Sequence, residues 1–204
     1  MEDLVIIGAG QSAIQCINSL KKEGYAGSIT MIGEEEHLPY QRPPLSKGFL
    51  EDSVNKERLY FKKLDFFTEN KIQLKLGTSA NKVDLENKLV FLSDDTNLSF
   101  DKLVFATGSR VRKLDFPGSN LSSIHYLRGL DDAESIKNDL ERSKEVVVIG
   151  AGYIGLEVAA IAAKKNVTVS VIEMADRVMN RTVDPQISDY YLKLHQNNGV
   201  KFIF

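Results

Sequence analysis

The sequence has little from which a disulfide, a cysteine metal centre or a membrane span could be built. Cys16 is the only cysteine among the 204 residues, so an internal disulfide and a cysteine metal cluster are excluded, and we expect no metal site. A single cysteine is typical of a reducing compartment and favours a cytoplasmic protein. The apolar run Leu4–Ile7 follows an acidic start and is too short for a signal-peptide core or a membrane span.

An excess of either charge is also missing. The chain carries 26 Lys and Arg against 28 Asp and Glu, for a net charge of −2. Such a balance gives no electrostatic basis for binding nucleic acid or an anionic membrane. With 43% hydrophobic and 26% charged residues the composition is that of an ordinary globular protein, and its length allows one large or two small domains.

One arrangement of elements occurs twice along the chain. A short apolar strand, a glycine-rich turn, a helix and a second strand followed by glutamate begin near residue 4 and again near residue 145. The predicted elements, in chain order, are a strand at 4–7, a helix at 12–23, a strand at 28–32, a helix at 62–69, a strand at 72–76, a meander through 80–106, a helix at 131–142, a strand at 145–149, a helix at 153–165, a strand at 167–172, a helix at 184–197 and a strand from 200.

The first glycine-rich turn, at 8–13, fits the pattern G-x-G-x-x-G/A of dinucleotide-binding proteins. Gly8 permits the tight turn from strand to helix, Gly10 lets the backbone approach a pyrophosphate, and Ala13 lets helix and strand pack closely. The N-terminus of the following helix offers free N–H groups and the positive end of its dipole to phosphates. This turn is therefore predicted to bind the pyrophosphate of a dinucleotide.

A carboxylate some 20 residues further on is needed for the adenosine ribose of such a ligand. Glu34 lies 21 residues after Ala13 and directly follows the second strand. Glu35 and Glu36 are close competitors, and Glu34 is preferred because it is nearest to the strand end.

The second turn has all three glycines of the pattern: Gly150, Gly152 and Gly155. Its ribose acid is Glu173, 18 residues after Gly155 at the end of the next strand. A carboxylate there accepts hydrogen bonds from both ribose hydroxyls of NADH and repels the 2′-phosphate of NADPH. Arg177 is close in sequence and would favour that phosphate, but we interpret it as a solvated helix residue.

Two such sites predict two dinucleotides, one a bound flavin and the other a nicotinamide cofactor that exchanges, with hydride transfer between their rings. The predicted fold is α/β, with two Rossmann-like domains. We assign residues 1–115 to an FAD-binding domain and 116–204 to an NAD-binding domain, with an exposed link at 110–128. The second domain is expected to be incomplete, because no fourth strand follows.

Several stretches resemble one known family. They are PYQRPPLSK at 39–47, ATG at 106–108, YLR at 126–128 and the segment 150–159. The whole chain is similar to the FAD-dependent, NADH-using ferredoxin reductases that serve cytochrome P-450 enzymes and ring-hydroxylating oxygenases. These enzymes belong to the pyridine nucleotide-disulfide oxidoreductase superfamily. The resemblance implies a flavoprotein that passes electrons from NADH through FAD to a [2Fe–2S] ferredoxin or to rubredoxin.

The resemblance also implies which residues contact the cofactors. The FAD contacts carried over by position are Gly8, Gly10, Ser12, Glu34, Arg42, Lys47, Ala80, Thr107, Gly108 and Arg128, and the first turn adds Gln11 and Ala13. The second turn and its helix give the nicotinamide contacts Gly150, Gly152, Tyr153, Ile154, Gly155, Glu157 and Glu173. Cations such as Arg42 and Arg128 suit a pyrophosphate or the electron-rich edge of a flavin.

Lys47 and Glu157 are the predicted catalytic pair. Lys47 ends the proline-rich loop, and Glu157 lies in the first turns of the second dinucleotide helix. We expect an ion pair beside the flavin, with charged atoms within about 6 Å of each other. A cation there would stabilise the negative charge of the reduced flavin.

The chain also departs from the family. The disulfide-using branch has a redox cysteine pair after its first βαβ unit, whereas this sequence has no cysteine there. Family members continue well beyond the length of this chain, which we interpret as a fragment that is not competent alone. A flavin subunit of a nitrite or monodehydroascorbate reductase, and a redox-sensing binding protein similar to apoptosis-inducing factor, remain as alternatives.

Overall fold

A computed structural model describes residues 2–204. The chain forms two compact units, one of Met1–Gln41 with Lys56–Arg110 and the other of Arg42–Asn55 with Val111–Phe204. Each unit has its own parallel sheet, and the first unit also contains an antiparallel one. None of the helices among the described residues is both long and apolar enough to cross a membrane.

The first unit contains a parallel sheet in the order β3-β2-β1-β7. Its strands are β1 (Asp3–Ile7), β2 (Ser28–Ile32), β3 (Ile72–Lys75) and β7 (Lys102–Phe105). Helix α1 (Gln11–Lys22) joins β1 to β2, and α2 (Leu64–Glu69) precedes β3. The strands therefore follow the 3-2-1-4 order of a Rossmann unit, whose ligands bind at the carboxyl ends of the strands.

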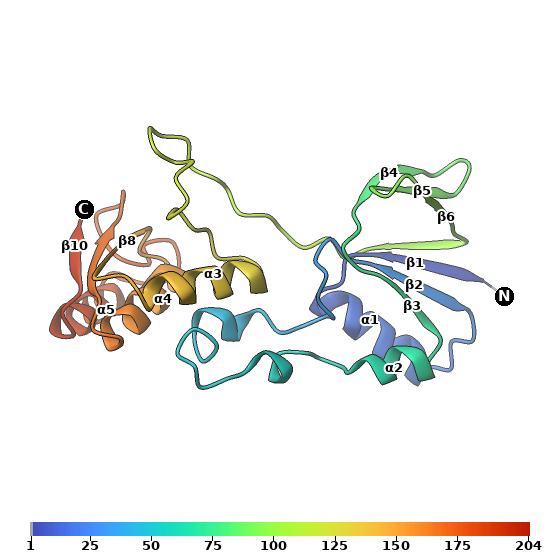
Figure 1. Ribbon diagram of the computed structural model, residues 1–204, viewed down its shortest axis with the longest axis horizontal. Coiled ribbons are helices and arrows are strands. Elements are labelled where there is room, and N and C mark those ends of the chain that lie inside the picture. Colours follow the sequence, from blue (N-terminus) through green and yellow to red (C-terminus); the bar gives the residue numbers. More distant parts are fainter. Residues whose placement is uncertain (1) are drawn as a thin grey trace. The chain divides into compact units, whose positions relative to one another are not determined.

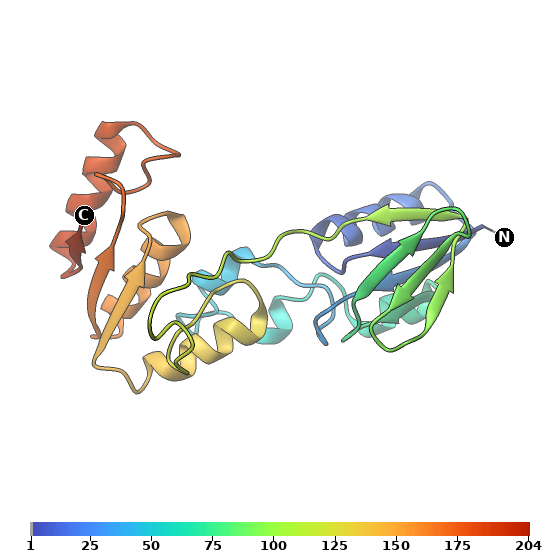
Figure 2. The same cartoon turned by 90° about the horizontal axis from the view of Figure 1, so that it is seen from above.

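Alternate residues of β1 pack on opposite faces of this sheet. Leu4 and Ile6 join a core with α1 and α2, whereas Val5 and Ile7 join a second core beneath a three-stranded antiparallel sheet. Figures 1 and 2 show the helices on one side of the parallel sheet and the antiparallel strands on the other. Coverage of both faces explains why β1 is almost continuously apolar.

The antiparallel sheet consists of β4 (Ala80–Asp84), β5 (Leu89–Leu92) and β6 (Asn97–Ser99). The predicted meander through 80–106 is therefore wrong in its last part, because β7 leaves the meander and pairs in parallel with β1. The reason is burial: Phe100, two residues before the start of β7, is buried in the core between the two sheets, and the chain then enters the parallel sheet. Alternation of residue type predicted the strand but could not identify its partner.

The second unit has a parallel sheet in the order β10-β9-β8. Its strands are β8 (Glu145–Ile149), β9 (Thr168–Ile172) and β10 (Lys201–Ile203), and its helices are α3 (Leu130–Leu140), α4 (Tyr153–Lys164) and α5 (Pro185–Asn197). Val169 and Val171 of β9 are buried in one core together with Leu156, Ala159 and Ala162 of α4. This is again a 3-2-1 arrangement, and among the described residues no strand pairs with the outer edge of β8.

Residues 42–55 belong to the second unit and not to the first, where the sequence had placed them within 1–115. This segment contains the 3₁₀ turn η1 (Pro43–Ser46), and the turn η2 (Lys56–Arg58) follows it. Leu50 is completely buried in the core of the second unit. Asp52 forms ion pairs with Lys137 and Lys165 of that unit. Apolar burial and ion pairing together hold the segment there.

Candidate functional site

The first glycine turn combines one glycine that the fold requires with one that leaves space. Gly8 has φ +118°, and a Cβ on it would lie 2.1 Å from the carbonyl oxygen of Ala106. Gly10 precedes the first residue of α1 in an extended conformation, and a Cβ on it would meet nothing within 4 Å. Ala13 is completely buried against the strand. The space at Gly10 is therefore not used by packing and is open to a ligand.

The second turn repeats this division. A Cβ on Gly155 would lie 2.0 Å from the carbonyl oxygen of Gly150, so the close packing of α4 on β8 requires glycine. Gly150 has φ +100°, which also favours glycine. A Cβ on Gly152 would meet nothing within 4 Å. Both turns thus leave their outer side open.

The two helices that follow these turns begin without a side-chain cap, as α2 and α3 also do. Both α1 and α4 are preceded by glycine. By contrast, the Asp184 carboxylate accepts hydrogen bonds from the first-turn N–H groups of α5 at 2.9 and 3.0 Å. At α1 and α4 no side chain takes up the N–H groups of the first turn, and the space at the preceding glycine fits the pyrophosphate of a dinucleotide.

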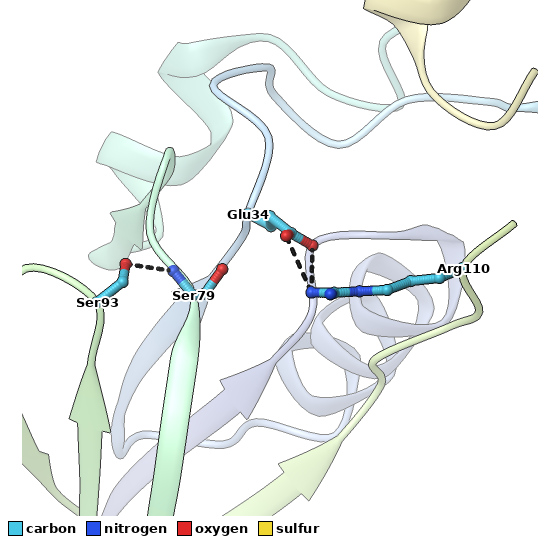
Figure 3. Close-up of polar contacts among 4 residues, drawn as sticks. All are labelled: Glu34, Ser79, Ser93 and Arg110. Carbon is cyan, nitrogen blue, oxygen red and sulfur yellow. Dashed lines mark hydrogen bonds and ion pairs between the residues drawn. The ribbon is translucent and has the colours of Figure 1, made fainter. Parts of the chain in front are cut away.

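Glu34 lies just beyond β2, as predicted, and its carboxylate pairs with Arg110. Nη2 of Arg110 donates to both carboxylate oxygens, at 2.9 and 3.0 Å (Figure 3). Its competitor Glu35 instead accepts a hydrogen bond from the hydroxyl group of Tyr40. Glu34 and Glu35 therefore both have polar partners, and Glu34 is the one paired with a cation.

The side chain of Glu173 is hydrogen-bonded to the backbone of the second glycine turn and to that of its own loop. Its carboxylate accepts hydrogen bonds from the backbone N–H of Ala151 at 2.7 Å and of Ala175 at 2.9 Å. Partial burial alone would raise the pKa of Glu173, but these backbone hydrogen bonds outweigh it and hold the pKa below its usual value. Glu173 is therefore an ionised carboxylate next to the predicted pyrophosphate site.

Arg177 does not lie in a helix, so its interpretation as a solvated helix residue is wrong. It lies in the loop between β9 and α5. Its Nη1 donates to the carbonyl oxygen of Val183 at 2.9 Å and its Nη2 to that of Asn180 at 2.8 Å. Arg177 therefore holds its own loop together.

Lys47 and Glu157 form the predicted ion pair, with Nζ and Oε1 2.9 Å apart. The hydroxyl of Ser46 donates to the other carboxylate oxygen, Oε2, at 2.5 Å. Nζ of Lys47 also donates to the carbonyl oxygen of Pro43 at 3.2 Å. Both carboxylate oxygens of Glu157 thus have donors from η1 and the residue after it.

The remaining predicted flavin contacts fall into two groups. Arg42 and Arg128 belong to the second unit, where Nη1 of Arg42 donates to the carbonyl oxygen of Arg128 at 2.8 Å. Ala80, Thr107 and Gly108 belong to the first unit, where Gly108 has φ +69°. The first unit therefore contains the predicted contacts of the glycine turn and Glu34. The second unit contains Arg42 and Lys47, which lie in segment 42–55, and Arg128.

Sequence reasoning did not find Arg110 or Ser46. Arg110 follows β7, so its position at the carboxyl end of a parallel strand would have indicated it if β7 had been assigned to the parallel sheet. Ser46 lies in a run that the sequence did single out, but no pattern distinguished it from the neighbouring residues.

The chain belongs to the pyridine nucleotide-disulphide oxidoreductase family, whose model matches residues 2–204. Among named relatives it is 42% identical to rhodocoxin reductase of Rhodococcus erythropolis, covering 97% of this chain and 46% of the relative. It is also 42% identical to the ferredoxin reductase component of the p-cumate 2,3-dioxygenase system of Pseudomonas putida, covering 97% of this chain and 49% of that relative.

Solved structures agree with this assignment. A ferredoxin reductase from Rhodopseudomonas palustris matches with a TM-score of 0.95 and 40% identity, over 100% of this chain and 50% of that one. Putidaredoxin reductase in its covalent complex with putidaredoxin matches with a TM-score of 0.92 and 37% identity, over 99% of this chain and 49% of that one. The chain spans about half the length of the relatives it matches.

Proposed function

We propose that this chain is part of an FAD-containing reductase that takes electrons from NADH and delivers them to a [2Fe–2S] ferredoxin or to rubredoxin. The observation that carries the proposal is the pair of open glycine turns, each with a carboxylate at the end of the next strand. The names of the relatives support it, because one is a rhodocoxin reductase and another is the ferredoxin–NAD(+) reductase component of a dioxygenase system. The single cysteine favours a reducing, cytoplasmic setting.

The first unit is proposed to hold FAD. Gly8, Gly10, Gln11, Ser12 and Ala13 would form the pyrophosphate site at the start of α1, where no side chain caps the helix. Glu34 would accept hydrogen bonds from the ribose, and Ala80, Thr107 and Gly108 would line the path of the cofactor. When bound, the flavin supplies the chemistry that accepts a hydride and releases single electrons.

The second unit is proposed to hold NADH. Gly150, Gly152 and Gly155 form the turn, and Tyr153 and Ile154 begin the helix, where both side chains are more than half exposed. Glu173 is ionised and would accept from both ribose hydroxyls, which favours NADH over NADPH. Its charge would repel the phosphate of NADPH.

Segment 42–55 and the residues just before α3 carry the cations that the family resemblance implies for a flavin, which are Arg42, Lys47 and Arg128. Arg42 and Arg128 would neutralise its phosphates, and Lys47 would stabilise negative charge on its ring. Glu157 fixes the ammonium group of Lys47 by the ion pair at 2.9 Å. No side chain in this proposal acts as a nucleophile, because the cofactors carry out the transfer.

The test is a purification of the whole protein followed by anaerobic titration. The expected result is a yellow protein that releases FAD on denaturation, is bleached by NADH and then passes its two electrons to two molecules of a one-electron [2Fe–2S] ferredoxin. A protein that retains FAD and is bleached by NADH but reduces neither ferredoxin nor rubredoxin would contradict the proposed partner. A protein that binds no flavin would contradict the whole proposal.

A further inference from the structure

The ion pair of Glu34 and Arg110 crosses over the first glycine turn. Glu34 follows β2 and Arg110 follows β7, and these two strands pair with β1 on its opposite sides. A contact between the carboxyl ends of β2 and β7 must therefore pass over the end of β1, where the turn begins. Figure 3 shows Arg110 extending from the segment after β7 toward Glu34.

The backbone around Glu34 is fixed independently of Arg110. The N–H of Thr78 donates to the carbonyl oxygen of Gly33 at 2.9 Å, and the N–H of Gly77 donates to that of Glu35 at 3.1 Å. The residues on both sides of Glu34 are thus tied to the loop between β3 and β4. The side chain of Glu34 is 63% exposed and pairs with Arg110.

The same loop is pinned where β4 begins. The N–H of Ser79 donates to Oγ of Ser93 at 3.0 Å (Figure 3). The N–H of Ser93 in turn donates to the carbonyl oxygen of Ser79 at 2.9 Å. This reciprocal pair fixes the chain just before Ala80, one of the residues proposed to line the path of the cofactor. Glu34 and Ala80 are therefore held by one hydrogen-bonded assembly of two loops.

The contact of Arg110 leaves Glu34 able to bind a ligand. A single nitrogen, Nη2, reaches both carboxylate oxygens, and each oxygen keeps a further lone pair. Two such oxygens, held in a fixed plane, are suited to accept hydrogen bonds from the two neighbouring hydroxyls of a ribose. Because the pair is exposed, with Arg110 80% and Glu34 63% accessible, it contributes little to folding.

We propose that Arg110 is a positioning residue for the adenosine half of FAD, acting by orienting the carboxylate of Glu34 toward the ribose hydroxyls. The inference rests on the proposed function, since it takes FAD as the ligand of the first unit. Arg110 thereby contributes to selection of FAD over FMN, which has no adenosine.

The test measures the dissociation constants of FAD and FMN for the apoprotein of the whole protein, by quenching of flavin fluorescence. Arg110→Ala should weaken FAD binding about tenfold, the loss of roughly one hydrogen bond to a charged group. FMN binding should not change. Arg110→Lys should recover most of the loss, because a single nitrogen makes both contacts.

A double-mutant cycle separates positioning from a general effect on structure. In the Glu34→Gln background, Arg110→Ala should have almost no further effect on FAD binding. Lys102→Ala is the control, because it removes another exposed ion pair of the same unit, that between Lys102, the first residue of β7, and Glu2 at 2.8 Å. It should leave the affinity for both flavins unchanged.

The outcomes distinguish the two proposals. FAD binding that is unchanged in Arg110→Ala, or a loss that is fully additive with Glu34→Gln, would overturn the role of Arg110 while FAD remained the cofactor. A wild-type apoprotein that binds neither flavin would overturn the proposed function, and this inference with it.

Discussion

Asp52 combines an unusual backbone conformation with two ion pairs. It has φ +69°, a conformation that Asp and Asn adopt more readily than other non-glycine residues, and it pairs with Lys137 and Lys165. Hydrogen bonds from Lys137 and then Lys165 hold the pKa of its carboxyl group below the usual value. Neighbouring Glu51 pairs with Lys164 at 2.8 Å. Glu51 and Asp52 together therefore hold segment 42–55 against the rest of the second unit.

Asp52→Asn should destabilise the protein by about 0.5–1 kcal/mol at pH 7, a range kept low because the side chain is 45% exposed. Asn keeps the backbone preference and removes only the charge. Because the folded pKa is lowered, the stabilisation is present above the unfolded pKa and is lost as the pH falls through the folded pKa. Urea unfolding at pH 7 and in acid below about pH 4, near the reference pKa of Asp, measures this difference.

The control for Asp52 is Asp189→Asn, which removes an exposed pair with Lys193 one turn away on α5. It should cost less at pH 7. A difference between wild type and Asp52→Asn that persisted unchanged in acid would contradict the electrostatic origin of the effect.

Glu173 sets the predicted preference for NADH. Glu173→Gln removes the charge that repels a 2′-phosphate while keeping one oxygen as an acceptor for the backbone. The ratio of kcat/KM for NADH over NADPH should fall by about tenfold, which corresponds to about 1.4 kcal/mol of discrimination. Steady-state kinetics on the whole protein measures it. A wild type that uses NADPH as well as NADH would contradict the prediction and point to another selector.

At the scale of elements, each glycine turn contains one glycine that packing requires and another that leaves space for a ligand. Gly8 and Gly155 are needed because a side chain would collide with backbone oxygens at 2.1 and 2.0 Å. Gly10 and Gly152 have negative φ and open space, so alanine fits the protein at both positions. Alanine substitutions at the two kinds of glycine should therefore have different effects, on ligand binding in one case and on stability in the other.

Gly10→Ala should fold with near-normal stability but lose flavin, and Gly152→Ala should fold and keep flavin but lose NADH affinity, because each added methyl group occupies the pyrophosphate space. Gly8→Ala and Gly155→Ala should lower the melting temperature, by several degrees for each kcal/mol lost. Thermal unfolding of the apoproteins, together with flavin content and NADH titration, distinguishes the pairs. A Gly10→Ala protein that retained FAD with wild-type affinity would refute the site.

The elements that carry local signals were predicted closely. Strands β2 and β8 have the predicted bounds, and α1 and α4 end within one residue of prediction. The ion pair of Lys47 and Glu157 was also predicted correctly. Long-range choices were not predictable in this way: the partner of β7, the unit that residues 42–55 join, and the contact of Arg110 with Glu34 each depend on packing between distant segments. Periodicity indicates which residues are buried, but it does not indicate which element they pack against.

At the scale of the whole molecule, the sheet of the second unit has one covered and one open face. Val146 and Val148 of β8 pack against the core with α4, whereas Val147 and Ile149, on the other face, are 58% and 56% exposed. Ile172 of β9 adds to this open face. Parallel sheets are normally covered on both sides, so an open face of this kind favours association.

The edge of the same sheet is also exposed. Strand β8 pairs with β9 on one side, and among residues 2–204 nothing pairs with its other side. Its sequence, EVVVI, is apolar and rich in β-branched residues. Such an edge presents unpaired N–H and C=O groups to other chains. The ligand crevice of a Rossmann unit lies between strand 1 and strand 4, and only the strand-1 side is present among these residues.

A polypeptide of these 204 residues alone should therefore associate, hold FAD weakly and show negligible NADH-dependent reduction of a ferredoxin. Gel filtration after incubation with FAD, together with ferricyanide reduction by NADH, measures all three properties. Replacing Val147 by Lys on the open face should lower the extent of association without affecting the Gly8–Ala13 turn in the other unit, because charges on exposed strands oppose pairing. A monomer with stoichiometric flavin and turnover near ~10 s⁻¹, an ordinary enzymatic rate, would show that these residues suffice for catalysis and that the open face and edge of β8 do not limit the protein.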